Sequence, residues 1–167
     1  MVTLALDLGT CFGWSVFQDG IYKTSGYITL KSKKFAGKIH EFHSQIKKLI
    51  KAILKTFDIG LQELTVVYEH VIAHSSSHAA HLYGAFLGII QLLLSETTSL
   101  VPLSVTRIKK VFTGRGNCGK QEMVQQAVNM YPYLKTRSED NIRFHNEADA
   151  IAINYTYWEE IKNGKYK

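Results

Sequence analysis

The sequence predicts an α/β protein in which helices flank one mixed central sheet. Three short apolar strands, at residues 3–8, 14–17 and 22–30, follow one another near the start of the chain. Later apolar strands at 64–69 and 100–103 alternate with long stretches of helical periodicity. Consecutive strands joined by tight turns pair antiparallel, whereas strands that alternate with helices favour parallel pairing. We therefore expect three antiparallel strands followed by parallel ones.

The composition is typical of a globular protein. Of the 167 residues, 46% are hydrophobic and 20% are charged, which suits one domain over residues 1–167. We expect no signal peptide and no membrane span, because the apolar stretch at 82–94 is too short. Cys11 and Cys118 show neither zinc nor disulfide spacing, so a cytoplasmic protein is expected. The net charge of +6 favours polyanionic partners, and a solvated basic surface explains it equally well.

The first half of the chain begins as a meander and continues into a long helix. Asp19 and Gly20 separate two apolar runs, and Asp-Gly at such a place is a strong hairpin signal. Apolar residues then recur at helical spacing over 39–54, with lysines on the other face. We predict an amphipathic helix whose lysine face is solvated.

The strand at 64–69 ends in an acid and leads into a segment rich in serine and histidine. A helix from about 77 to 94 follows, and it contains the small residues Ala79, Ala80, Gly84, Ala85 and Gly88. Internal packing is the common reason for such residues, and a dimer seam is the alternative. The histidines of this region are His70, His74, His78 and His81. No carboxylate or cysteine accompanies them at zinc spacing, so we interpret them as incidental, with DNA backbone contact second.

The rest of the chain is mostly helical and basic. A basic helix is predicted over 105–112, and a glycine-rich loop follows at 113–119. The next helix spans 120–130 and ends at Tyr-Pro. The polar segment 136–141 is predicted as a mobile loop, and a last helix runs from about 143 to 161.

Three acids in apolar surroundings point to a metal centre. Asp7 lies in the first strand, Glu69 ends a later strand and Asp149 lies in the final helix. A buried charge is costly unless it is paired or bound to a cation. Hard cations such as Mg²⁺ prefer carboxylate oxygens, and two such ions can activate a water for phosphodiester hydrolysis.

The helical neighbours of Asp149 suggest further site residues. Asn146 at i−3 and His145 at i−4 share its face of the helix, so we rank both as metal-proximal. His145 could ligate a metal, hold the attacking water or protonate the leaving oxygen, or be only a polar residue near the helix start. Glu147 lies roughly 200° around the helix and is expected to face solvent or a basic neighbour.

These residues together resemble the RuvC family of Holliday junction resolvases, within the RNase H-like nucleases. The matching segments are LALDLGT with Gly13-Trp14-Ser15-Val16, Val67-Tyr68-Glu69, Leu82-Tyr83-Gly84-Ala85, the basic helix and loop at 105–120, and Asn146-Glu147-Ala148-Asp149-Ala150-Ile151-Ala152. No single motif is decisive, but their order along nearly the whole chain is specific. The resemblance implies an RNase H-like fold.

The resemblance also implies site residues. Asp7, Glu69 and Asp149 would be ligands of Mg²⁺, or of Mn²⁺. The family usually has an acid three residues before the last ligand, where this chain has Asn146, so the fourth ligand stays open between Asn146, His145 and Glu147. Lys109 and Lys120 match basic positions of the family that approach the DNA backbone, and the further DNA-binding candidates are Arg107, Lys110 and Arg115. An aromatic wedge that the family often has after its glutamate is missing at 71–74.

The implied activity is metal-dependent resolution of branched DNA. A homodimer would nick a four-way (Holliday) junction symmetrically, and phosphate binding by lysine and arginine would be sensitive to salt. The departures at Asn146 and in the His/Ser-rich segment would suit a phage or viral member, acting in the bacterial or host-cell cytoplasm.

Three other functions stay open at this point. A related nuclease could act on flaps, forks or RNA–DNA hybrids. Residues 7–10 also resemble the phosphate-binding turn of actin-like ATPases and sugar kinases, although those folds usually need two such domains. A DNA-binding module without catalysis is the third, because an amide stands at position 146.

Overall fold

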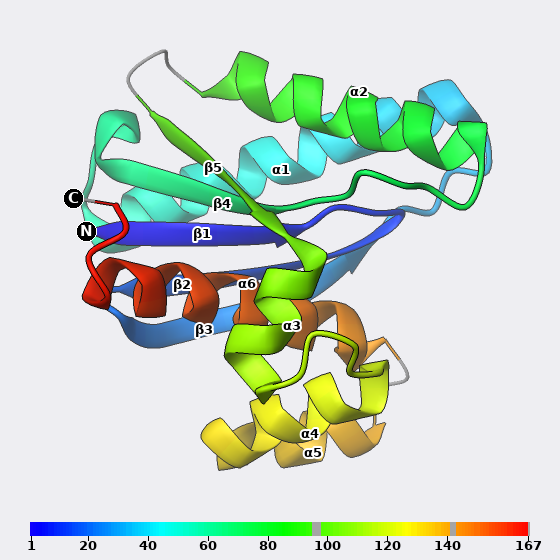
Figure 1. The fold of residues 1–167 in the computed structure, drawn as a ribbon. Coiled ribbons are helices and arrows are strands. Elements are labelled where there is room, and N and C mark those ends of the chain that lie inside the picture. The colour runs from blue at the N-terminus through cyan, green and yellow to red at the C-terminus, as the bar shows by residue number, and fades with distance from the viewer. Residues whose placement is uncertain (95–97, 141–142, 167) are drawn as a thin grey trace.

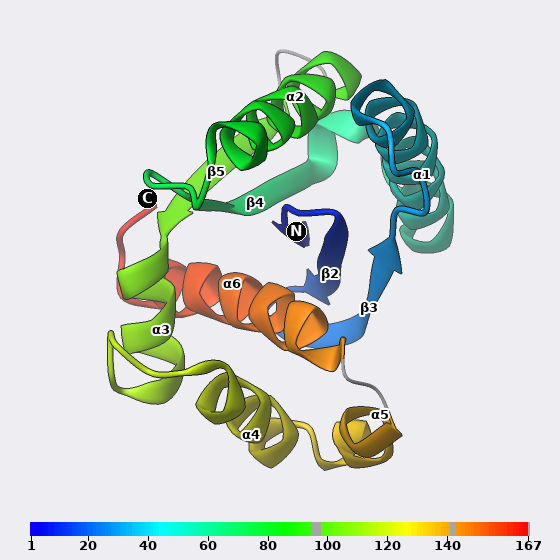
Figure 2. The ribbon, with the colours of Figure 1, turned by 90° about the vertical axis from the view of Figure 1, so that its right-hand side faces the viewer.

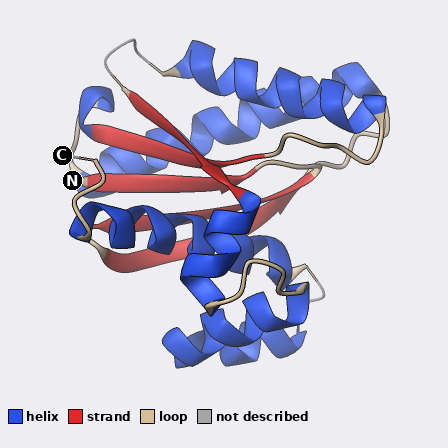
Figure 3. Cartoon of the chain, in the orientation of Figure 1, coloured by secondary structure: helices blue, strands red, loops and turns tan. Residues whose placement is uncertain are grey.

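A five-stranded mixed sheet forms the centre of the protein (Figures 1 and 3). The computed structural model describes residues 1–94, 98–140 and 143–166. The strands are β1 (Val2–Asp7), β2 (Cys11–Gln18), β3 (Ile21–Thr29), β4 (Leu64–His70) and β5 (Ser99–Ser104). In the order β3-β2-β1-β4-β5, the first three strands pair antiparallel, and β4 and β5 join β1 in parallel. The predicted sheet, antiparallel strands followed by parallel ones, is confirmed.

Helices cover both faces of this sheet (Figure 2). They are α1 (Phe35–Phe57), α2 (Ser77–Leu93), α3 (Val105–Thr113), α4 (Lys120–Met130), α5 (Lys135–Asp140) and α6 (Phe144–Lys162), with short 3₁₀ turns at Leu61–Glu63 and Pro132–Leu134. Helices α1 and α2 lie on one face, and α6 lies on the other with α3 and α4 beside it. None of the described helices is both long and apolar enough to cross a membrane.

The turn between β2 and β3 has the backbone that its Asp-Gly pair predicts. Asp19 and Gly20 have φ angles of 51° and 77°, both in the left-handed region. A type I′ hairpin turn requires this conformation at both central residues, so the sequence signal is confirmed. The pairing of β2 with β3 shifts register between Val16 and Phe17, and no sequence signal predicted this bulge.

Alternate side chains of the central strands enter two separate cores. In β1, Leu4 and Leu6 pack with α1 and α2, whereas Ala5 packs with α3, α4 and α6. In β4, Val66 faces the first core and Val67 the second. Because side chains alternate with period two, the odd-numbered residues of both strands point toward α6.

Helix α6 lies very close to the sheet, because Gly13 of β2 faces it without a side chain. A Cβ at Gly13 would come within 1.8 Å of the backbone oxygen of Asn146. Further along, the buried Asn154 accepts a hydrogen bond from Thr3 Oγ1 (2.6 Å) and donates to the Ser15 backbone oxygen (3.1 Å). These contacts fix the depth and register of α6 on β1 and β2.

Two predictions about local structure are corrected. Residues 135–140, which the sequence analysis places mostly in a mobile loop, form α5, and the last residue of that predicted loop lies outside the described part of the chain. Internal packing also does not explain the glycines of α2. A Cβ added at Gly84 or Gly88 would meet no atom within 4 Å, so both glycines lie on an open face of the helix.

Candidate metal centre and nucleic-acid interface

Asp7 and Glu69 lie side by side at the carboxyl ends of two adjacent parallel strands. The register pairs Leu6 of β1 with Tyr68 of β4, and each acid is the next residue of its strand. Both acids are odd-numbered in their strands, so both point to the face of the sheet that α6 covers. Because β1 and β4 are neighbours in the sheet, the two acids lie at the same end of it.

Asp149 approaches the same place from the second turn of α6. A cavity of about 180 Å³ lies between the sheet edge, α3, α4 and α6, and its lining includes Glu69, Asp149, Lys109 and Lys120. The charge of Asp149 acts on Asp7 as well. The structure thus brings together three acids that are separated by up to 142 positions in the sequence, since 149 − 7 = 142.

The three carboxylates make one another harder to ionise. Burial raises the pKa of Asp7 well above its usual range, and the charges of Asp149 and Glu69 raise it further. Burial and Glu69 raise the pKa of Asp149 from 3.8 to about 7, against the opposing charges of Lys120 and Lys109. Burial also raises the pKa of Glu69, which Lys109 partly offsets. Unpaired negative charges so close together favour a bound cation or proton.

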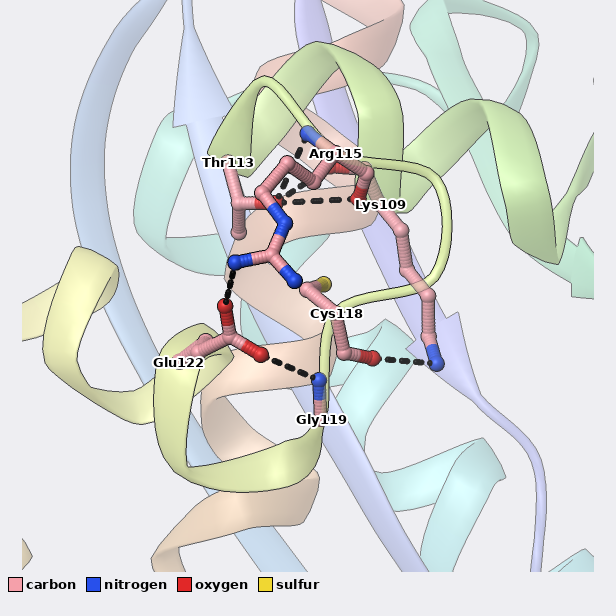
Figure 4. A network of polar contacts seen from close by, with 6 residues as sticks. All are labelled: Lys109, Thr113, Arg115, Cys118, Gly119 and Glu122. Atoms are coloured by element: carbon pink, nitrogen blue, oxygen red, sulfur yellow. Dashed lines mark hydrogen bonds and ion pairs between the residues drawn. The ribbon is translucent and has the colours of Figure 1, made fainter.

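Lys109 is held beside these acids by the glycine-rich loop (Figure 4). Its ammonium group donates to the backbone oxygen of Cys118 at 2.8 Å. In the same network, Glu122 accepts from the Gly119 amide at 2.8 Å and pairs with Arg115 at 3.1 Å, which closes the loop onto the start of α4. Lys120 follows directly and is exposed. Lys109 of α3 and Lys120 at the start of α4 thus place two ammonium groups at the acidic cavity, with the loop joining their helices.

The donor set suits a hard divalent cation. All three side chains offer carboxylate oxygens, and the contacts among the described residues include no hydrogen bond or ion pair to these carboxylates. At the same time, no three described His, Cys, Asp or Glu side chains stand close enough to form a complete metal-ligand cluster. The oxygens fit the ion chemically, and ligation would draw them closer together.

Asn146 and His145 take different positions around the start of α6. The Asn146 side-chain nitrogen donates to Cys11 Sγ at 3.3 Å and to the Arg143 backbone oxygen at 3.1 Å. His145 lines a groove of about 600 Å³ together with Lys120 of α4. Asn146, like Asp7, is not among the described residues that line the cavity with Glu69 and Asp149, and its side-chain oxygen takes no part in these two contacts.

Glu147 does not face solvent. Its side chain is buried, accepts from Ser25 Oγ at 2.5 Å and pairs with Arg137 at 2.8 Å. The solvent-facing alternative is wrong, and the basic neighbour is Arg137 of α5. Sequence reasoning missed Arg137, because no local pattern connects residue 137 with residue 147 or with Ser25 of β3.

The basic residues expected to contact DNA fall into two groups. Lys110, Arg115 and Lys120 are exposed on α3, the glycine-rich loop and α4. Arg107, in contrast, forms an ion pair with the mostly buried Glu160 of α6. This pairing gives Arg107 a structural role in joining α3 to α6.

Comparison with known proteins finds likeness in structure but not in sequence. No family model and no curated protein matches the sequence. The structure of Thermus thermophilus RuvC is similar, with a TM-score of 0.71 and 18% identity over 99% of this chain and 98% of that chain. T. thermophilus RuvC in complex with a Holliday junction substrate gives a TM-score of 0.73 and 16% identity over 99% and 97%. The chain thus has the RNase H-like fold of RuvC over almost its whole length.

Proposed function

We propose that this protein is a structure-specific DNA endonuclease that resolves four-way junctions by metal-dependent, symmetric phosphodiester hydrolysis. The observation that carries the proposal is the meeting of Asp7, Glu69 and Asp149 beneath Lys109 and Lys120. The shared fold adds support, because one of the similar structures is T. thermophilus RuvC with a Holliday junction substrate. The protein would act on DNA in the cytoplasm of a bacterium or of an infected host cell.

The three carboxylates would hold Mg²⁺, or Mn²⁺, next to the scissile phosphate. Such ions supply a nucleophile from bound water and neutralise charge on the phosphoryl oxygens. Lys120 and Lys109 would bind the phosphate, since both ammonium groups already act on the charge of Asp149. His145, in the neighbouring groove, would orient the attacking water or protonate the leaving oxygen.

The DNA backbone would run from this cavity along the groove beside α4. Lys120 lines both the acidic cavity and the groove of about 600 Å³, so the two are neighbours. Gln121, Gln125 and Ser138 add hydrogen-bonding groups to the groove. Contacts of this kind fix the position of a strand and do not read its sequence.

A homodimer would place two such sites on one junction. The outer face of α2 carries Gly84 and Gly88, where an added Cβ would meet no atom within 4 Å, and Leu92, which is 88% exposed. Small residues next to an exposed leucine allow two helices to approach closely with apolar contact. We therefore assign the dimer seam to this face of α2.

The test is cleavage of an end-labelled four-way junction in Mg²⁺, in Mn²⁺ and in EDTA. The wild-type protein is expected to make paired, symmetric nicks with either metal and none in EDTA. Asp7→Asn should bind the junction and leave it uncut, because it removes one ligand without changing the size of the side chain. Lys47→Gln, on the solvated face of α1, is a control that should cut normally.

Two outcomes would contradict the proposal. Cleavage of flaps or forks but not of junctions would keep the metal site and assign another RNase H-like nuclease. Tight junction binding without cleavage in either metal would assign a binding module, an alternative favoured by the Asn146 amide and by the incomplete ligand cluster.

A further inference from the structure

A second cavity lies across the sheet edge from the three acids. Its volume is about 260 Å³, and its lining residues come from the segment after β1, from α1, from the segment after β4 and from α2. The floor is apolar and consists of Leu8, Leu82 and Phe86. None of the proposed metal ligands lines it, so it is separate from the metal centre.

Flat and cationic side chains surround the mouth of this cavity. Tyr83 and His74 lie with their rings 4.9 Å apart, and His78 packs against Phe35 at 5.5 Å. Lys38 contributes the one fixed charge among the described lining residues, none of which is acidic. An apolar floor, aromatic walls and a cationic rim suit a flat heteroaromatic group that carries a phosphate beside it.

The cavity is mechanically joined to the metal centre. Leu8, Gly9 and Thr10 line it and follow Asp7 directly in the chain. The Tyr83 hydroxyl donates to the backbone oxygen of Glu69 at 2.8 Å and accepts from the Val71 amide at 3.4 Å. A group bound against the Tyr83 ring would thus be linked to Glu69 through a single hydrogen bond, the one from the Tyr83 hydroxyl to the Glu69 backbone oxygen.

We propose that this cavity binds a single unpaired nucleobase of the junction, drawn out of the stack at the branch point. The proposal rests on the junction-binding function proposed above and names the part of the DNA that is recognised. The volume is below the roughly 300–1,000 Å³ of typical ligand sites, which excludes a base pair and suits one base. Bases at a branch point cost less to draw out than bases inside a duplex, because the continuous helical stack is interrupted there.

The proposal is tested with a substitution that fills the cavity and leaves the metal centre unchanged. Ala79 lines the cavity on the first turn of α2, and Ala79→Leu would occupy the space of the base. Ala52→Leu is the matched control, since Ala52 is exposed in a separate groove on α1. All proteins carry Asp7→Asn so that the DNA stays intact, and thermal unfolding confirms that each is folded. The probes are immobile four-way junctions with 2-aminopurine at one branch nucleotide at a time, and a linear duplex.

The Asp7→Asn protein is expected to raise 2-aminopurine fluorescence at one branch position. Ala79→Leu should abolish this signal and weaken junction binding about tenfold, as expected for one lost base–aromatic stacking contact, without changing duplex binding. His74→Ala should likewise lower the fluorescence signal and weaken junction binding. Because His74 lies outside the helices, this variant tests the cavity even if Ala79→Leu does not fold.

The opposite results separate the two proposals. If Ala79→Leu and His74→Ala bind the junction as tightly as Ala52→Leu and keep the fluorescence signal, the base-binding cavity is wrong and the resolvase proposal stands. If no variant prefers the junction over the duplex, the junction function fails, and the cavity proposal fails with it.

Discussion

Asp7 and Asp149 resist ionisation because each is buried beside other carboxylates, and this affects the stability of the metal-free protein. The pKa of Asp149 rises from 3.8 to about 7 on folding, so the folded state binds a proton that the unfolded chain releases. Proton binding by Asp149 therefore contributes its full amount to the free energy of unfolding below about pH 4, and this contribution is lost as the pH rises to about 7. In EDTA, we expect the urea midpoint to fall over this window.

The variant Asp149→Asn tests whether this pH dependence comes from the carboxylate of Asp149. Asp149→Asn removes the repelling charge, so in EDTA at pH 7.5 it should be more stable than wild type by about 1–3 kcal/mol. Saturating Mg²⁺ should reverse the order, because only the wild-type protein gains from binding. A wild-type midpoint that stays flat or rises between pH 4 and 7 would contradict the electrostatic account.

Asn146 stands at a position where the family that this sequence resembles usually has an acid. Its amide donates to Cys11 and to the Arg143 backbone oxygen, and neither contact needs a charge. Asn146→Asp should add a negative ligand beside the site and lower the Mg²⁺ concentration for half-maximal junction cleavage by about tenfold, or about 1.4 kcal/mol. Asn146→Ala should raise it. Equal metal requirements for both variants would show that position 146 does not touch the metal.

At the scale of residues, the sequence predicts where acidic side chains lie better than it predicts which distant residues form ion pairs. Asp7 and Glu69 could be placed because strand ends and a period of two determine where they point. The ion pair of Arg107 with Glu160 joins residues 53 positions apart, as 160 − 107 = 53, and no periodicity predicts such a contact. The raised pKa of Asp149 likewise depends on burial, which only the folded chain defines.

At the scale of elements, β2 and α6 approach each other very closely at Gly13. A Cβ at Gly13 would overlap the backbone of Asn146, which cannot move as a flexible side chain would. Gly13→Ala should therefore cost about 3 kcal/mol or more and displace the start of α6, with loss of cleavage. Gly119→Ala is the control, since its Cβ would meet only Glu122 at 3.8 Å, and it should cost less than about 1 kcal/mol. Chemical denaturation measures both.

Helix α5 shows how tertiary contacts determine an element that the sequence analysis predicted as a loop. Its residues are polar and lack helical periodicity, but Arg137 pairs with the buried Glu147 and ties α5 to α6. Arg137→Ala would leave a buried carboxylate unpaired and should cost about 1–3 kcal/mol, less than a fully buried pair because the guanidinium is half-exposed. Adding Glu147→Gln should recover part of this loss. Equal denaturation midpoints for the single and double variants would contradict the pairing.

At the scale of the whole molecule, the order of strands and helices was enough to predict the sheet. Consecutive strands with an Asp-Gly turn gave the antiparallel half, and intervening helices gave the parallel half. The open face of α2 could not be predicted, because small residues at this spacing are more commonly explained by internal packing, with a dimer seam as the alternative. Only the absence of neighbours around Gly84 and Gly88 separates the two.

The open face of α2 leads to a prediction about coupling between two subunits. Gly84→Leu should leave the monomer folded, because no atom lies within 4 Å of its new Cβ, but it should hold two helices apart. Sedimentation equilibrium should then show a monomer, whereas the wild-type protein is expected to be a dimer. On a junction held in a supercoiled cruciform plasmid, wild type should give linear product from paired nicks, whereas Gly84→Leu should give nicked circles. Ala52→Leu, an equal change on the exposed face of α1, should leave both readouts unchanged. A dimeric Gly84→Leu protein that still linearises the plasmid would place the seam elsewhere on the molecule.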